Sequence, residues 1–132
     1  MITTPRFLTL DEVLYFHQQE MLYSGWSLEL HDRGALEAAN EAPKVSFDGQ
    51  FLMDIFEMAA TYTNSICFNH PFLDGNKRTA ALSSLSFLFF NGYEYSENYD
   101  EELADTILAL VTHKISKKDL AAYFKKQSRL LT

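Results

Sequence analysis

The chain has few of the residues that build disulfide-stabilised, strand-rich or nucleic-acid-binding proteins. Its 132 residues include one cysteine, Cys67, which permits no internal disulfide and no cysteine-based zinc cage, so we expect a reducing, cytoplasmic environment. Only five glycines and three prolines are present, and apolar residues recur at helical spacing. With 18 acidic against 11 basic side chains, the net charge of −7 argues against a nucleic-acid or anionic-membrane binder.

Neither a targeting segment nor a membrane span is expected. The N-terminus lacks a basic stretch followed by an apolar one, so the sequence predicts no secretion signal. The most apolar stretch, residues 80–90, is interrupted by serines and is too short to cross a bilayer. Length and composition, with 47% apolar and 22% charged residues, predict one globular domain over residues 1–132.

The N-terminal third of the chain predicts two helices. Thr9 and Glu12 form the pattern of a capping box ahead of the first. Its inner face would carry Leu10, Val13, Leu14, His17 and Met21. Asp32 is placed to cap a short helix over residues 33–40, which Pro43 prevents from continuing.

A longer helix and a central helix are predicted in the middle of the chain. Asp48 is the expected cap of the longer one, with an inner face of Leu52, Ile55, Phe56, Ala59, Thr63 and Ile66. The periodicity breaks over residues 69–76. The next helix, residues 77–91, is apolar nearly all round, which is typical of a helix in the middle of a bundle, and Gly92 suits the left-handed position that ends it.

The C-terminal part predicts a short extended stretch at residues 93–95 and two more helices. Asp100 is expected to cap the first of them, and Ser116 with Asp119 marks the start of the last. Their inner faces would be Leu103, Ile107, Leu110 and Val111, then Leu120, Tyr123 and Phe124. The predicted fold class is therefore all-α.

One segment carries the candidate chemistry: His70-Pro71-Phe72-Leu73-Asp74-Gly75-Asn76-Lys77-Arg78. Gly75 and Asn76 tolerate unusual backbone angles just before a helix, whose first N–H groups have no partner within the helix and carry its positive dipole end. Lys77 and Arg78 add two positive charges at the same place. We therefore predict that this turn binds nucleotide phosphates through Gly75, Asn76, Lys77 and Arg78.

Two further side chains of the segment are suited to catalysis. Asp74 offers a carboxylate beside the phosphates, which is how Mg²⁺ is usually held, together with substrate oxygens. His70 offers an imidazole, the side chain most often used to deprotonate an attacking hydroxyl. Taken singly, these are a surface histidine, a turn aspartate and a solvated basic pair, but the ordered set predicts nucleotide-dependent group transfer. Phe72 and Leu73 are interpreted as core anchors.

The segment resembles the Fic motif, His-X-Phe-X-(Asp/Glu)-Gly-Asn-(Gly/Lys)-Arg, at every specified position. Its surroundings are similar to the death-on-curing (Doc) branch of the Fic/Doc family: Asn69, Lys77 where most Fic enzymes carry glycine, Thr79-Ala80, Phe87-Leu88 and Asn91-Gly92. Residues 32–39 look like that branch's Arg-Asp-X-Gly-Leu-Leu-Glu-Ser-Ala element, with His31 at the usual arginine position and Arg33 two places later.

The resemblance implies a compact helical bundle with the motif between two central helices. In the family, the histidine at the position of His70 is the general base, the acidic residue at Asp74 binds Mg²⁺, and the turn from Gly75 to Arg78 holds the phosphates. Most Fic members transfer AMP from ATP to a protein hydroxyl. Doc toxins bind ATP reversed, transfer its γ-phosphate to a threonine of elongation factor Tu, and are neutralised by a Phd-type antitoxin.

On this resemblance we expect a Doc-like toxin that uses ATP and Mg²⁺ to phosphorylate a Thr or Ser hydroxyl of a protein target. Two alternatives stay open: AMP transfer by the Fic route, and a catalytically silent domain that only binds nucleotide or a partner. Lys77 favours phosphoryl transfer, since a lysine fills the room that a glycine leaves for a diphosphate.

Other polar candidates have structural interpretations. His17, on the apolar face of the first helix, is expected to be a buried core histidine. Cys67 follows a buried pattern with no adjacent base, so a structural role is expected. His31 and His113 have no partner at metal-ligand spacing, and no zinc site is expected.

Overall fold

The computed structural model describes residues 4–25, 27–95 and 101–131. Within these ranges the helices are α1 (Leu10–Ser24), α2 (Arg33–Glu41), α3 (Ile55–Asn69), α4 (Asn76–Phe90), α5 (Glu101–Val111) and α6 (Lys117–Gln127), with a short 3-10 turn η1 (Ala42–Lys44) after α2. The short strands β1 (Ser46–Phe47) and β2 (Gln50–Phe51) pair antiparallel, as do β3 (Tyr93–Tyr95) and β4 (Ser128–Leu130). The predicted all-α class is confirmed.

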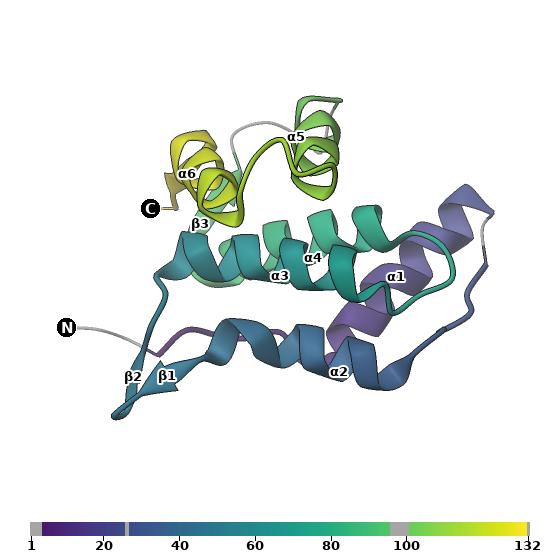
Figure 1. Cartoon of the computed structure of the whole chain (residues 1–132), viewed down its shortest axis with the longest axis horizontal. Coiled ribbons are helices and arrows are strands. Elements are labelled where there is room, and N and C mark those ends of the chain that lie inside the picture. The colour runs from purple at the N-terminus through teal and green to yellow at the C-terminus, as the bar shows by residue number, and fades with distance from the viewer. Residues whose placement is uncertain (1–3, 26, 96–100, 132) are drawn as a thin grey trace.

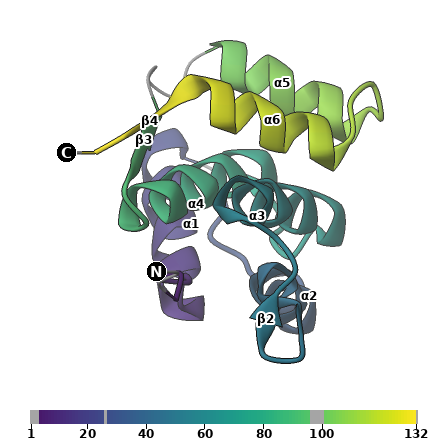
Figure 2. The same ribbon diagram turned by 90° about the vertical axis from the view of Figure 1, so that its left-hand side faces the viewer.

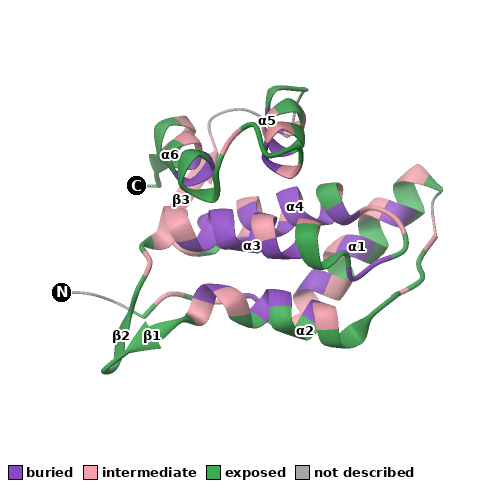
Figure 3. Ribbon diagram, in the orientation of Figure 1, coloured by how far each residue is buried: buried purple, intermediate pink, exposed green. Residues whose placement is uncertain are grey.

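The helices form three layers, with α3 and α4 side by side in the middle (Figures 1 and 2). Helices α5 and α6 cover one side of this pair, and α1 and α2 lie on the other. Buried residues are concentrated on α3 and α4 (Figure 3). The helix that follows the motif is therefore central, as predicted. None of the helices in the described ranges has the length and apolar character needed to cross a bilayer.

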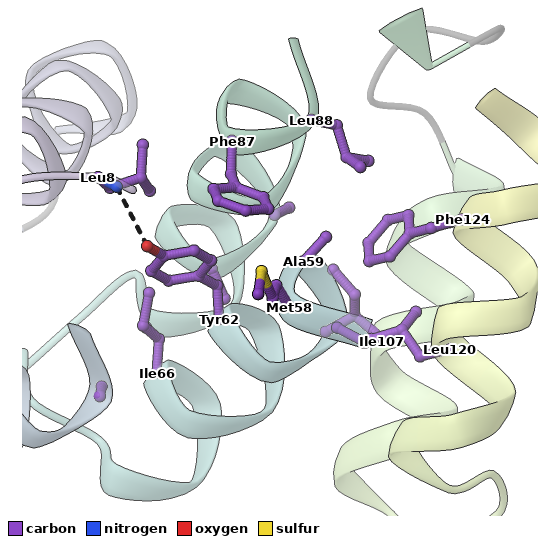
Figure 4. Close-up of a cluster of buried hydrophobic side chains, with 14 of the residues drawn as sticks. Leu8, Met58, Ala59, Tyr62, Ile66, Phe87, Leu88, Ile107, Leu120 and Phe124 are labelled. Carbon is purple, nitrogen blue, oxygen red and sulfur yellow. Dashed lines mark hydrogen bonds between the residues drawn. The ribbon is translucent and has the colours of Figure 1, made fainter. Parts of the chain in front are cut away.

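The core joins the three layers through large side chains of the middle pair. Tyr62 and Phe87 are fully buried against each other, with ring centroids 5.1 Å apart. The Tyr62 hydroxyl accepts a hydrogen bond of 3.1 Å from the Leu8 N–H, which ties the N-terminal segment to α3 (Figure 4). On the other side Ile107 and Phe124 extend the cluster into α5 and α6 (Figure 4). Burial of this kind supplies most of the folding free energy.

Helix ends follow local signals for the most part. The capping boxes of Thr9 with Glu12 and of Ser116 with Asp119 are both present. The side chain of Asp32 accepts from the Ala35 N–H at 3.0 Å, as expected of the α2 cap. The expected cap at Asp100 lies outside the described residues, and the single domain over residues 1–132 stays a prediction.

The prediction that Asp48 caps the third long helix is wrong. Asp48 and Gly49, with φ of 51° and 77°, form the turn between β1 and β2, since left-handed angles at both positions suit a tight hairpin. Helix α3 begins after Asp54, which forms a capping box with Glu57. Leu52 is consequently 63% exposed instead of lying on an inner face.

Candidate functional site

The motif forms the connection between α3 and α4. His70 caps the C-terminus of α3 in the left-handed conformation, with φ 50° and ψ 55°, and the proline after it prevents the helix from continuing. Gly75, with φ 82° and ψ 20°, is the N-cap of α4. The N–H groups of Asn76 and Lys77 therefore belong to the first turn of α4, where a helix has no acceptors of its own for its N–H groups.

A cavity of about 610 Å³ lies at this connection. It is lined by every residue predicted to act, namely His70, Asp74, Gly75, Asn76, Lys77 and Arg78. Apolar side chains complete the lining: Cys67 and Phe68 of α3, Leu73 of the motif, and Val111 of α5. The volume falls within the range of about 300–1,000 Å³ typical of small-molecule sites. The fold thus brings the predicted residues together around one space, which we call the motif cavity.

An extended stretch before α2 holds the motif from outside. The Pro71 carbonyl accepts hydrogen bonds from the N–H groups of His31 and Asp32 at 2.8 and 2.9 Å, and the Leu73 N–H donates to the Glu29 carbonyl at 3.1 Å. His31 therefore contributes its backbone, while its side chain is exposed and does not line the motif cavity. Arg33 pairs with Glu37 at 3.9 Å on the surface of α2.

Asn76 acts on the motif backbone through its side chain. Its Oδ1 accepts from the Phe72 N–H at 3.1 Å, and its Nδ2 donates to the Phe72 carbonyl at 2.8 Å. The side chain of Asn76 is thus engaged with the motif backbone, and its main-chain N–H is the group left for the predicted phosphate. Phe72 is fully buried, which confirms it as a core anchor, but Leu73 is 48% exposed at the cavity rim and is not one.

Asp74 is held through two of its oxygens. Its carboxylate Oδ2 accepts from the Ser27 N–H at 3.3 Å, and its carbonyl oxygen lies 2.8 Å from His17 Nε2. Within the described ranges, no group of three or more His, Cys, Asp and Glu residues is placed to form a metal cage. A single half-buried carboxylate beside the predicted phosphate site nevertheless fits Mg²⁺, which needs one or two carboxylates and takes its other ligands from substrate and water.

The basic residues of the turn differ in their surroundings. Lys77 is exposed at the start of α4. Arg78 is half-buried, and its Nη1 donates to Glu20 Oε2 of α1 at 3.4 Å. Burial raises the pKa of the Cys67 thiol to about 12, against the smaller opposing effect of Lys77. A thiol that stays neutral is no nucleophile, which supports the structural interpretation of Cys67.

Sequence reasoning missed the part that α1 plays in this site. His17 is 3% exposed, as predicted, but its ring also stacks on Phe72 with centroids 3.6 Å apart. The side chain of Met21 occupies the space that a Cβ at Gly75 would need. These contacts join segments more than fifty residues apart, and the only local signal for them is a histidine on an otherwise apolar helix face.

Comparisons with known proteins agree with this geometry. Residues 7–88 match the family model described as "Fic/DOC family", and the chain therefore belongs to the Fic/Doc family. Within the family it is similar to Doc toxins. It is 31% identical over 116 residues to "Protein kinase doc" of Escherichia phage P1, covering 88% of this chain and 90% of that protein. It is 32% identical over 85 residues to "Toxin Doc" of Mycolicibacterium smegmatis, covering 64% and 65%.

Proposed function

We propose that this protein is a Doc-like toxin that transfers the γ-phosphate of ATP to a Thr or Ser hydroxyl of a protein target. The observation that carries the proposal is the motif cavity, where His70, Asp74 and the turn of residues 75–78 surround one space. The name of the phage P1 relative supports phosphoryl transfer, and that of the M. smegmatis relative supports a toxin.

In the proposed complex the phosphates lie at the start of α4. The main-chain N–H groups of Asn76 and Lys77 would donate to their oxygens, and the Lys77 and Arg78 side chains would add full charges. The ion pair of Arg78 with Glu20 is partly exposed, and such pairs contribute only about 0–1 kcal/mol, so a phosphate can replace the carboxylate. Asp74 would hold Mg²⁺, which when bound neutralises charge on the transferred phosphoryl group.

His70 is the proposed general base. Its exposed position on the rim of the motif cavity is open to a hydroxyl presented by another protein. As that oxygen bonds to the γ-phosphorus, the hydroxyl proton passes to the imidazole, the bond from phosphorus to the β,γ-bridging oxygen breaks, and ADP leaves. The positive groups of the turn stabilise the charge that spreads over the phosphoryl oxygens, which is usually the largest contribution to this catalysis.

The target and the antitoxin also belong to the proposal. By analogy with the Doc branch, we propose elongation factor Tu as the target and a Phd-type antitoxin as the neutralising partner, both acting in the cytoplasm. Transfer of AMP is the main competing reaction. The exposed Lys77 at the first turn favours phosphoryl transfer, since its side chain takes space that a diphosphate would need beside the turn.

The proposal is tested by incubating the protein and elongation factor Tu with Mg²⁺ and ATP labelled on either its α- or its γ-phosphate. We expect label on elongation factor Tu from the γ-position only, and none with His70→Ala. Label from the α-position would establish AMP transfer instead. Intact ATP binding without any transfer to elongation factor Tu or to other proteins of a cytosolic extract would favour a silent binding domain.

A further inference from the structure

The Asp74–Gly75 peptide rests on one face of α1. His17 and Met21 are four residues apart and therefore lie on the same side of that helix. His17 Nε2 is 2.8 Å from the Asp74 carbonyl oxygen, and the Met21 side chain fills the space beside Gly75. Both side chains are buried, with 3% and 1% exposure. A helix outside the motif thus supports the residue that we assign to magnesium.

The contact between His17 and Asp74 has a defined direction. A carbonyl oxygen only accepts hydrogen bonds, so Nε2 of His17 carries the hydrogen. The imidazole lies flat on Phe72, with an interplanar angle of 6°, which opposes rotation of the donor away from Asp74. The Phe72 backbone is itself held by its two hydrogen bonds with the Asn76 side chain, one donated and one accepted. The donor is therefore fixed relative to the motif.

The direction of the Asp74 carboxylate depends on this support. The hydrogen bond that its Oδ2 accepts from the Ser27 N–H is 3.3 Å long and so at the weak end for a hydrogen bond. The shorter bond from His17 fixes the backbone of Asp74, a residue that lines the motif cavity. Loss of the His17 donor would allow the Asp74 peptide to rotate and the carboxylate to turn with it.

We propose that His17 is a positioning residue that sets magnesium affinity by donating from Nε2 to the Asp74 carbonyl. The inference rests on the proposed function, because it takes Asp74 to be the magnesium ligand. Residues that orient a metal ligand typically change metal affinity by about 10–100-fold when they are replaced. We expect a smaller effect on the affinity of the turn for phosphates alone, since the hydrogen bond and the ring stacking of His17 are to Asp74 and Phe72 and not to the Lys77 and Arg78 side chains.

The test measures binding of a non-hydrolysable ATP analogue by calorimetry, once in EDTA and once in Mg²⁺. His17→Phe keeps a flat ring on Phe72 but has no donor, and His17→Gln keeps an N–H donor of similar reach. In EDTA we expect both variants to bind nearly as well as the wild type. The gain in affinity on adding Mg²⁺ should fall about tenfold in His17→Phe and recover most of that loss in His17→Gln. The matched control is His31→Gln, which replaces an exposed histidine side chain that does not line the motif cavity and keeps the backbone N–H that bonds Pro71.

A magnesium gain in His17→Phe equal to that of the wild type overturns the role of His17 alone. Equal losses in His17→Phe and His17→Gln overturn it too, because they assign the effect to packing. A wild-type protein that binds the analogue without any response to Mg²⁺ overturns the assignment of Asp74 as well. If His17→Phe does not fold, His17→Leu replaces it as the variant without a donor, and the same outcomes decide.

Discussion

Asn76 and Phe72 hold each other through two reciprocal hydrogen bonds of 3.1 and 2.8 Å between one side-chain amide and one backbone unit. Both residues are buried, so neither bond has water as a ready substitute. The bonds close the motif across four residues and set the course of the chain from Phe72 to the first turn of α4. Asn76, which we assign to phosphate binding through its main-chain N–H, thus also shapes the loop through its side chain.

The Asn76→Asp variant tests this shaping role. Aspartate keeps the size of the side chain but replaces the donor to the Phe72 carbonyl by a second acceptor. We expect the free energy of unfolding to fall by about 1–3 kcal/mol, measured by urea denaturation. Asn64→Asp, a half-buried asparagine on α3, is the control and should change stability by no more than about 0.5 kcal/mol. Equal losses of stability in the two variants would argue against a role for the hydrogen bonds between Asn76 and Phe72 in shaping the loop.

Gly75→Ala should destabilise the protein for two separable reasons. A left-handed backbone costs an L-residue about 1–2 kcal/mol, and the new Cβ would also collide with the Met21 side chain. Gly49→Ala is a matched control, because Gly49 has a similar φ of 77° but no atom within 4 Å of an added Cβ. We expect the larger loss at Gly75 in urea denaturation, and Met21→Ala should reduce that excess. Equal losses of stability at both glycines would show that the Met21 side chain moves aside without a measurable loss of free energy.

Stability should decline at alkaline pH because of Cys67. Burial raises the pKa of its thiol from 9.0 to about 12, so the unfolded chain loses this proton first as the pH rises. The folded state then binds more protons than the unfolded state, and the free energy of unfolding falls above pH 9. In Cys67→Ala the decline should start nearer pH 10, where Tyr62, with a pKa raised to about 12, has the same effect. Urea unfolding curves of the wild type and of Cys67→Ala, measured across this pH range, test the prediction. Superimposable profiles of stability against pH would contradict the role of Cys67.

Lys77→Gly should change which phosphate is transferred. Removal of the exposed side chain opens space beside the turn, so we expect more transfer from α-labelled ATP relative to γ-labelled ATP. Lys77→Met separates space from charge, because it keeps most of the volume without the ammonium group. The steric account requires Lys77→Met to keep the wild-type ratio of the two labels. An unchanged ratio in Lys77→Gly would contradict it.

Much of the fold follows from local chemistry that the sequence displays. The capping boxes at Thr9 and Ser116 were predictable because each joins residues only three positions apart. The error at Asp48 arose because two aspartates, Asp48 and Asp54, are each suited to cap the helix that follows, and only Asp54 does so. The Asp48-Gly49 pair favours a tight hairpin, and Asp54 with Glu57 matches a capping box. Both features could therefore have been predicted from the sequence.

The site divides in a similar way. The candidate site residues at the motif cavity, His70 and residues 74–78, were predictable because they lie within one contiguous segment at a helix start, whereas Val111 of α5 comes from a distant part of the chain. The support from His17 and the pairing of β3 with β4 join positions far apart in the chain, and no local pattern specifies such contacts. The exposure of Leu73 was also missed, since an apolar residue beside a cavity has the same composition as one in the core.

The central claim is that His70 faces the terminal phosphate of a nucleotide held by the start of α4. A crystal structure with a non-hydrolysable ATP analogue and Mg²⁺ tests it most directly. We predict phosphate oxygens on the N–H groups of Asn76 and Lys77, the metal on the Asp74 carboxylate, and the His70 imidazole beside the γ-phosphate. An analogue bound elsewhere, or an imidazole packed away from the phosphates, would contradict the account.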